Sequence, residues 1–103
     1  MEVYGLLTVA EIRTIIIPLV EKYPVRRVIL FGSYARGDAT VHSDIDLIID
    51  SENNISGFDF FGIAGRIIKE MPVKIDVFEM GEIEISSKLN KNIIQDGVVI
   101  YEA

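Results

Sequence analysis

Residues 32–46 read Gly-Ser-Tyr-Ala-Arg-Gly-Asp-Ala-Thr-Val-His-Ser-Asp-Ile-Asp. Gly32 and Ser33 follow an apolar run, and ten residues separate Ser33 from a pair of aspartates, Asp44 and Asp46. A glycine after a strand lets the backbone approach a phosphate, and a serine hydroxyl together with the amides of a helical turn over 33–36 can bind that anion. Two carboxylates can hold a metal ion. The segment therefore predicts a phosphate-binding turn beside a pair of metal ligands.

The sequence around this segment alternates between helical and extended patterns. β-branched and aromatic residues predict strands, which we place at 25–31, 44–50, 73–78 and 98–101. Apolar periodicity and capping residues predict helices, which we place at 8–23, 57–71 and 87–95. Pro18 is expected to kink or split the first helix. The order of elements predicts an α/β (α+β) fold, a small sheet covered by helices, and leaves the strand order open.

Both long helices begin at capping residues and carry apolar side chains that should face the sheet. Thr8 and Glu11 have capping-box spacing, and Ser56 and Asp59 have the same separation. The stripe of the first helix is expected to consist of Ile12, Ile15, Ile16 and Leu19. The anchors of the second helix are expected to be Phe58, Phe61, Ile67, Ile68 and Met71.

Three aspartates fall on matching faces of two predicted strands. Residues two apart on a strand point the same way, so Asp44 and Asp46 share a face with Cα atoms about 7 Å apart. In the strand 73–78 the apolar residues alternate with Asp76, which points away from the core. If the two strands are neighbours, about 4.8 Å apart, the three carboxylates converge.

Such a cluster is costly without a counter-ion. Two unit charges 6 Å apart repel by roughly 3 kcal/mol at an effective dielectric of about 20. Oxygen ligands without a nearby histidine or cysteine favour Mg²⁺ or Mn²⁺ over zinc. Two such ions would orient a triphosphate and stabilise both the attacking and the leaving oxygen.

Composition narrows the classes of function. The 103 residues fit one domain, 1–103, and half of them are hydrophobic. The net charge of −6 argues against direct nucleic-acid binding, which needs a basic surface. The absence of cysteine excludes disulfides and suits a reducing cytoplasm. No membrane span is expected, and the first seven residues lack the basic and apolar regions of a signal peptide.

The pattern Gly-Ser-x10-Asp-x-Asp, with a third carboxylate on a later strand, resembles the active site of the polymerase-beta-like nucleotidyltransferase superfamily. The strings 30–38 and 43–47 resemble the minimal nucleotidyltransferases (MNT), which contain only the catalytic core. The resemblance covers nearly the whole chain, including Asp76 and the closing residues 96–101, and no motif position is degraded. It implies the polymerase-beta-like fold with a small mixed β-sheet.

The resemblance also implies roles for the residues of the motif. Gly32 and Ser33 would hold the β- and γ-phosphates of ATP. Asp44 and Asp46 would bind two Mg²⁺ ions, with Mn²⁺ as a substitute, and Asp76 would complete one metal site and help to deprotonate an acceptor hydroxyl. That hydroxyl would attack the α-phosphate and release pyrophosphate.

Five further residues are left with open roles. Arg36 and Ser43 are expected among the phosphate contacts, although Arg36 can instead organise the turn by pairing with Asp38. The lone histidine, His42, is expected to be a loop residue and not a ligand. Lys74 could reach a triphosphate, as could Lys88.

The resemblance implies a partner as well as a reaction. Many minimal members are paired with a helical HEPN toxin, a ribonuclease, and adenylylate one of its tyrosines as the antitoxin. A homo- or hetero-oligomer is therefore expected. One alternative is a non-catalytic antitoxin or subunit that neutralises its partner by binding. Another is transfer to a small molecule, although such enzymes generally use an additional domain to form the acceptor pocket.

Overall fold

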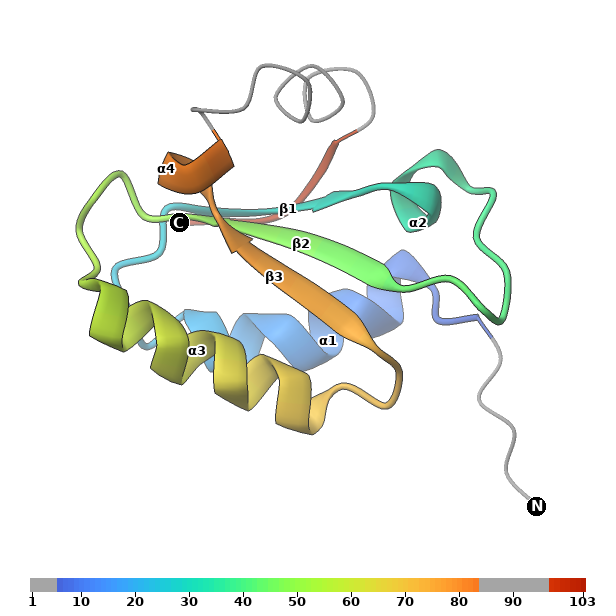
Figure 1. Cartoon of the computed structure of the whole chain (residues 1–103), viewed down its shortest axis with the longest axis horizontal. Coiled ribbons are helices and arrows are strands. Elements are labelled where there is room, and N and C mark those ends of the chain that lie inside the picture. Colours follow the sequence, from blue (N-terminus) through green and yellow to red (C-terminus); the bar gives the residue numbers. More distant parts are fainter. Residues whose placement is uncertain (1–5, 84–96) are drawn as a thin grey trace.

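The sheet of this protein has mixed strand directions and two long helices on one face. The computed structural model describes residues 6–83 and 97–103. The described elements are α1 (Val9–Val20), β1 (Arg27–Phe31), α2 (Ser33–Arg36), β2 (Ile45–Asp50), α3 (Gly57–Glu70), β3 (Ile75–Glu79), α4 (Met80–Ile83) and β4 (Val98–Glu102). The strand order is β3-β2-β1-β4 (Figure 1). β1 is antiparallel to β2 and β4, whereas β2 and β3 are parallel and joined through α3.

The long helices begin where the sequence predicts. The Thr8 side chain accepts from the Glu11 amide and the Glu11 side chain accepts from the Thr8 amide, which is the predicted capping box. Ser56 caps α3 by accepting from the Asp59 amide. α1 is continuous through Pro18 and ends at Val20, so the expected split does not occur. Pro18 has no N–H to donate to the Thr14 carbonyl, so the helix continues past it with that hydrogen bond missing. The predicted helix 87–95 lies outside the described residues.

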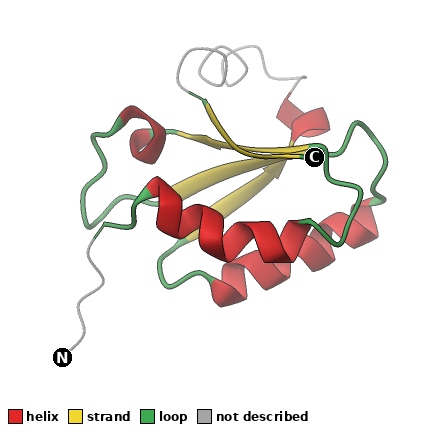
Figure 2. Cartoon of the chain, turned by 180° about the vertical axis from the view of Figure 1, so that it is seen from behind, coloured by secondary structure: helices red, strands yellow, loops and turns green. Residues whose placement is uncertain are grey.

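One face of the sheet and the inner faces of α1 and α3 enclose the main core. The two helices lie side by side on that face (Figure 2). Alternate residues of β2, namely Ile45, Leu47 and Ile49, point into this core, as the alternation in the sequence predicts. The buried residues contributed by α1 are Ile12, Ile16 and Val20, with Ile15 and Leu19 partly buried against them.

The predicted anchors of α3 are partly wrong. Phe58, Phe61 and Ile68 are exposed. The residues of α3 and its C-cap that face the core are Phe60, Ile63, Ala64, Ile67 and Met71. Both sets have helical spacing, so periodicity alone does not decide which one packs against the sheet. The larger side chains of the first set led to the wrong choice.

The opposite face of the sheet carries the aspartates. A small apolar cluster of Ile29, Phe31 and Ile48 lies on it, with Phe78 and Met80 packed alongside. α2 follows β1 at one end of the sheet and α4, which was not predicted, follows β3 at the other (Figure 1). Within the described residues, no helix has the length and apolar character needed to cross a membrane.

Candidate functional site

The site predicted from the motif lies at the α2 end of the sheet. β2 and β3 are neighbours, and Asp46 pairs in register with Asp76. On the other side of β2, Asp46 is in register with Phe31, the last residue of β1 before Gly32. The Ile45 amide donates to the Lys74 carbonyl at 3.0 Å, which places Asp44 beside Lys74. Asp44 and Asp46 thus lie on one face of the sheet beside the start of the predicted phosphate-binding turn, with Asp76 on the neighbouring strand.

Gly32 is the point of closest approach between the turn and the carboxylates. Its φ of 76° and ψ of −155° lie in a region that is essentially restricted to glycine. A Cβ at this position would lie 2.6 Å from Oδ2 of Asp46. Only a glycine therefore allows the chain to turn directly against the Asp46 carboxylate. The backbone and one carboxylate are held side by side, as a shared phosphate–metal site needs.

The turn after Gly32 is a short helix whose end is closed by hydrogen bonds. The Gly37 and Asp38 amides both donate to the Ser33 carbonyl, at 3.0 Å and 3.1 Å. Gly37 has a φ of 83°, the left-handed conformation typical of a helix end. Nε of Arg36 lies 3.3 Å from Oδ2 of Asp38. The pairing of Arg36 with Asp38, one of the two roles left open by the sequence, is therefore present.

The loop that leads into β2 is organised by Ser43. Its hydroxyl accepts from the Thr40 amide at 2.8 Å, and its own amide donates to the Thr40 carbonyl at 3.0 Å. The His42 amide donates to the Thr40 hydroxyl at 3.2 Å, and the residue is exposed in this turn. His42 is a loop residue, as expected. Ser43 fixes the loop immediately before Asp44, and its contact with phosphate stays a prediction.

The electrostatics of the site are dominated by Asp46. Burial raises the pKa of the Asp46 carboxyl above its usual value, and the charges of Asp76 and Asp44 raise it further. The positive charge of Arg36 lowers the pKa but does not outweigh the other causes. Keeping Asp46 ionised therefore costs free energy in the metal-free chain. A bound cation would remove that cost.

The chemistry of the donors fits a divalent cation that prefers oxygen. Asp44, Asp46 and Asp76 supply only carboxylate oxygens, the ligands of Mg²⁺ and Mn²⁺. Within residues 6–83 and 97–103, however, no three potential ligand groups already converge on one point. Oδ2 of Asp44 lies 3.3 Å from Nζ of Lys74, so a lysine neutralises this carboxylate. An ion would have to compete with Lys74 for Asp44.

The position of Lys74 was not inferred from the sequence, although a signal was present. Lys74 precedes Asp76 by two residues, just as Asp44 precedes Asp46. Once Asp46 is in register with Asp76 in parallel strands, Asp44 and Lys74 must be neighbours on the same face.

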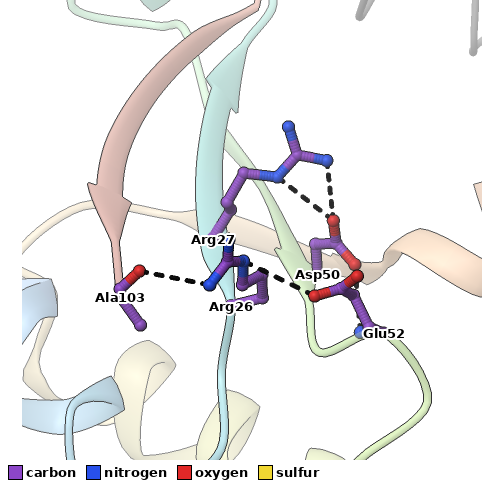
Figure 3. Close-up of polar contacts among 5 residues, drawn as sticks. All are labelled: Arg26, Arg27, Asp50, Glu52 and Ala103. Atoms are coloured by element: carbon purple, nitrogen blue, oxygen red, sulfur yellow. Dashed lines mark hydrogen bonds and ion pairs between the residues drawn. The ribbon is translucent and has the colours of Figure 1, made fainter.

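The opposite end of the sheet holds a second acidic residue on the same face, in a different environment. Asp50 is 7% exposed, and its Oδ2 accepts from Nη2 and Nε of Arg27 at 2.8 Å and 3.2 Å (Figure 3). Its Oδ1 accepts from the Glu52 amide at 3.1 Å. The hydrogen bonds that Arg27 donates to Asp50 raise the pKa of Arg27. The Arg27–Asp50 pair could not be identified from the sequence, because it depends on the register of β1 against β2, and tertiary contacts decide that register.

Comparison with known proteins identifies the family of the chain. Residues 14–103 match the family described as polymerase beta, nucleotidyltransferase. The protein adenylyltransferase MntA of Aphanizomenon flos-aquae is 35% identical, over 92% of this chain and 69% of that protein. The range matched by the family, residues 14–103, spans the segment from Gly32 to Asp76.

Solved structures share the fold. A toxin–antitoxin complex with AMP-PNP contains a chain that superimposes with a TM-score of 0.72 at 19% identity, covering 88% of this chain and 73% of that one. A complex of the tri-AMPylated HEPN toxin of Shewanella oneidensis with an MNT antitoxin gives a TM-score of 0.69 at 16% identity, covering 93% and 74%. At these identities the likeness establishes the fold, and the fold is that of the polymerase-beta-like nucleotidyltransferases.

Proposed function

This chain belongs to the polymerase beta nucleotidyltransferase family, and we propose that it transfers AMP from ATP to a tyrosine of a helical HEPN toxin, as that toxin's antitoxin. The observation that carries the proposal is the close approach of Gly32 to Asp46, with Asp76 in register beside it. The proposed phosphate-binding turn therefore lies next to the carboxylates of Asp46 and Asp76. The relative named as a protein adenylyltransferase and the fold neighbour in complex with an AMPylated HEPN toxin support the choice of donor and acceptor.

The residues of the turn act on the triphosphate. Gly32 lets the backbone lie against the β- and γ-phosphates, and Ser33 at the start of α2 offers its amide and hydroxyl to them. Arg36 shapes the turn through Asp38 and adds positive charge near the site. Ser43 holds the loop before Asp44 and is proposed as a further phosphate contact.

The aspartates act at the reacting atoms. Asp44, Asp46 and Asp76 would hold two Mg²⁺ ions, which would supply positive charge for the developing charge on the phosphate oxygens. Asp76 accepts the proton of the tyrosine hydroxyl. The phenolic oxygen then forms a bond to the α-phosphorus, and the bond between that phosphorus and the bridging oxygen to the β-phosphate breaks. Pyrophosphate leaves, and the tyrosine carries AMP.

The acceptor is proposed to come from another polypeptide because the described site has little to enclose it. Three pockets lined by described residues lie away from Asp44, Asp46 and Asp76, around Asp50 and along β4. A protein acceptor would itself supply the surface that encloses its reacting hydroxyl. We propose that residues 1–103 act as one nucleotidyltransferase domain in the cytoplasm, where ATP is available.

The test uses ATP labelled at the α-phosphate, Mg²⁺ and the product of the gene adjacent to the one that encodes this chain. Label should move to a tyrosine of that protein. Asp44→Asn and Asp46→Asn should each lower the rate of transfer by at least about 10²-fold while leaving binding to the partner intact. If the wild-type chain binds and neutralises the partner without transferring label, the chain acts by binding alone and the proposed chemistry is wrong.

A further inference from the structure

Lys74 pairs with one of the predicted metal ligands. Its Nζ lies 3.3 Å from Oδ2 of Asp44. The contact follows from the register of the parallel strands β2 and β3, because the Ile45 amide donates to the Lys74 carbonyl at 3.0 Å. A positive charge that belongs to the chain thus already contacts a carboxylate to which the proposed chemistry assigns Mg²⁺.

The Lys74–Asp44 pair is exposed, unlike the pair at the other end of the same sheet face. The side chain of Lys74 is 73% exposed and that of Asp44 is 38% exposed. The side chain of Asp50, in contrast, is 10% exposed and accepts two hydrogen bonds from the guanidinium of Arg27. An exposed lysine pair contributes little stability, and the ammonium is a compact charge on a flexible side chain. The Lys74–Asp44 pair can therefore be broken at small cost when a ligand offers another partner.

Lys74 also lies near the predicted phosphate-binding turn. Phe31, the last residue of β1, is in register with Asp46, and Gly32 follows it. The turn, Asp44 and Lys74 therefore lie at the same end of three neighbouring strands. Neighbouring strands are about 4.8 Å apart, so the Lys74 backbone is roughly 10 Å from the turn, and its side chain already extends toward β2 to reach Asp44. Rotation of that side chain would bring the ammonium to an anion held by the turn.

We propose that Lys74 moves from Asp44 in the empty site to the phosphates of ATP in the loaded site, so that a metal ion binds well only together with the nucleotide. The inference rests on the proposed function, because it takes ATP to bind at the turn and Mg²⁺ to bind at the aspartates. A cation at Asp44 repels the ammonium and a triphosphate attracts it, so both ligands favour the same exchange. An ion that binds alone has to displace Lys74 without that compensation.

The exchange gives Lys74 a different role in each state of the site. In the empty site the lysine compensates the charge of Asp44 and so reduces the repulsion among the three aspartates. In the loaded site it is a ligand of the phosphates. A nucleotide that removes Lys74 from Asp44 raises the affinity for the ion, and by linkage the ion raises the affinity for the nucleotide by the same factor.

The first test measures the binding of Mn²⁺ to the full chain without nucleotide, from the electron paramagnetic resonance signal of free Mn²⁺. Lys74→Met should bind Mn²⁺ about threefold more tightly than the wild type, because no ammonium competes for Asp44. Lys74→Arg keeps the charge but forms a stronger pair with a carboxylate, so it should bind Mn²⁺ about twofold more weakly.

Lys69→Met is the matched control for the loss of charge. Lys69 is exposed in the last turn of α3, and within residues 6–83 and 97–103 it forms no ion pair. Its substitution removes the same charge without touching Asp44, so the affinity for Mn²⁺ should stay within about 1.5-fold of the wild type. Far-UV circular dichroism verifies that every variant keeps its helices.

The second test measures the binding of Mn²⁺ together with α,β-methylene-ATP, which lacks the bond that the reaction breaks, by isothermal titration calorimetry. Lys74→Met should bind this complex about threefold more weakly than the wild type, because a phosphate ligand is missing. The variant thus has opposite effects on the ion alone and on the ion with nucleotide.

Several results would overturn the inference. They are an affinity for Mn²⁺ that Lys74→Met leaves unchanged, a Lys74→Arg variant that binds Mn²⁺ as tightly as the wild type or more tightly, and equal binding of the nucleotide complex by Lys74→Met and the wild type. A wild type that binds neither ligand would overturn the proposed function as well. A chain that meets both binding expectations but transfers no label keeps the inference and loses the proposed chemistry.

Discussion

On the sheet face that α1 and α3 leave uncovered, the acidic residues at the two ends have opposite electrostatic environments. Asp50 is buried, paired with Arg27 and hydrogen-bonded to the Glu52 amide. Asp46, four residues earlier on the same strand and face, lies among like charges, and burial together with those charges raises its pKa. A carboxylate whose charge is compensated within the chain contributes to stability. Asp46, whose charge its neighbours do not compensate, is the carboxylate that we expect a bound cation to neutralise, whereas Asp44 beside it is paired with Lys74.

The largest expected effect is on catalysis at the uncompensated end. Asp46→Asn removes one negative charge where a cation is needed, and the rate of AMP transfer should fall by about 10²–10³-fold. Asp50→Asn is the matched control, since it makes the same chemical change on the same face of β2 and should leave most of the activity. Initial rates with α-labelled ATP give the comparison. If Asp46→Asn transferred AMP within tenfold of the wild-type rate, the claim that Asp46 is needed for catalysis and Asp50 is not would be contradicted.

Gly32→Ala should be the most destabilising change at the functional end. Its φ of 76° and the 2.6 Å approach of a Cβ to Asp46 both oppose a side chain, so the free energy of unfolding should fall by roughly 3 kcal/mol. Gly37→Ala is the control, because its φ is also positive but its Cβ would meet nothing within 4 Å. It should cost only about 1 kcal/mol. Equal losses in urea unfolding would mean that the contact with Asp46 does not matter.

At the compensated end, Asp50→Ala should lower the free energy of unfolding by about 2 kcal/mol. The change leaves Arg27 without its carboxylate and the Glu52 amide without its acceptor. Glu52→Ala removes the partner of the exposed Arg26 ion pair, at 3.5 Å, and should change stability by less than about 0.5 kcal/mol (Figure 3). If both variants unfold at the same urea concentration, Asp50 has no special structural role.

The smallest effect is the dependence of stability on pH. The pKa of Asp46 is higher in the folded chain than in the unfolded chain, so the folded state binds the proton more tightly. The stability linked to this proton is present below the ordinary aspartate pKa and is lost as the pH rises through the raised pKa. Asp46→Asn should therefore match the wild type in acid and exceed its stability at neutral pH. A gain that does not change with pH would point to another cause.

The sequence was sufficient for the parts of the molecule that depend on local chemistry. The caps at Thr8 and Ser56, the turn after Gly32 and the common face of Asp44 and Asp46 each follow from a few neighbouring residues. The register of Asp46 with Asp76 could be stated only as a condition, because strand order is decided by contacts between distant segments.

The parts that were missed depend on tertiary packing. α3 has two stripes of helical spacing, and only the docking of the helix on β2 and β3 selects the one that contains Ile63 and Ile67. The Arg27–Asp50 and Lys74–Asp44 pairs arise from strand register. Whether Arg36 and Ser43 contact phosphate depends on where the nucleotide binds, and the fold of the chain alone does not determine that position.

Thermal unfolding with and without Mg²⁺ tests the contrast between the two ends most directly. In EDTA, Asp46→Asn should melt at a higher temperature than the wild type, and Asp50→Asn at a lower one. Added Mg²⁺ should raise the melting temperature of the wild type and of Asp50→Asn but not that of Asp46→Asn, because binding to the folded state alone stabilises it. If Mg²⁺ leaves the wild type unchanged and Asp46→Asn melts below it in EDTA, the uncompensated carboxylates are not a metal site.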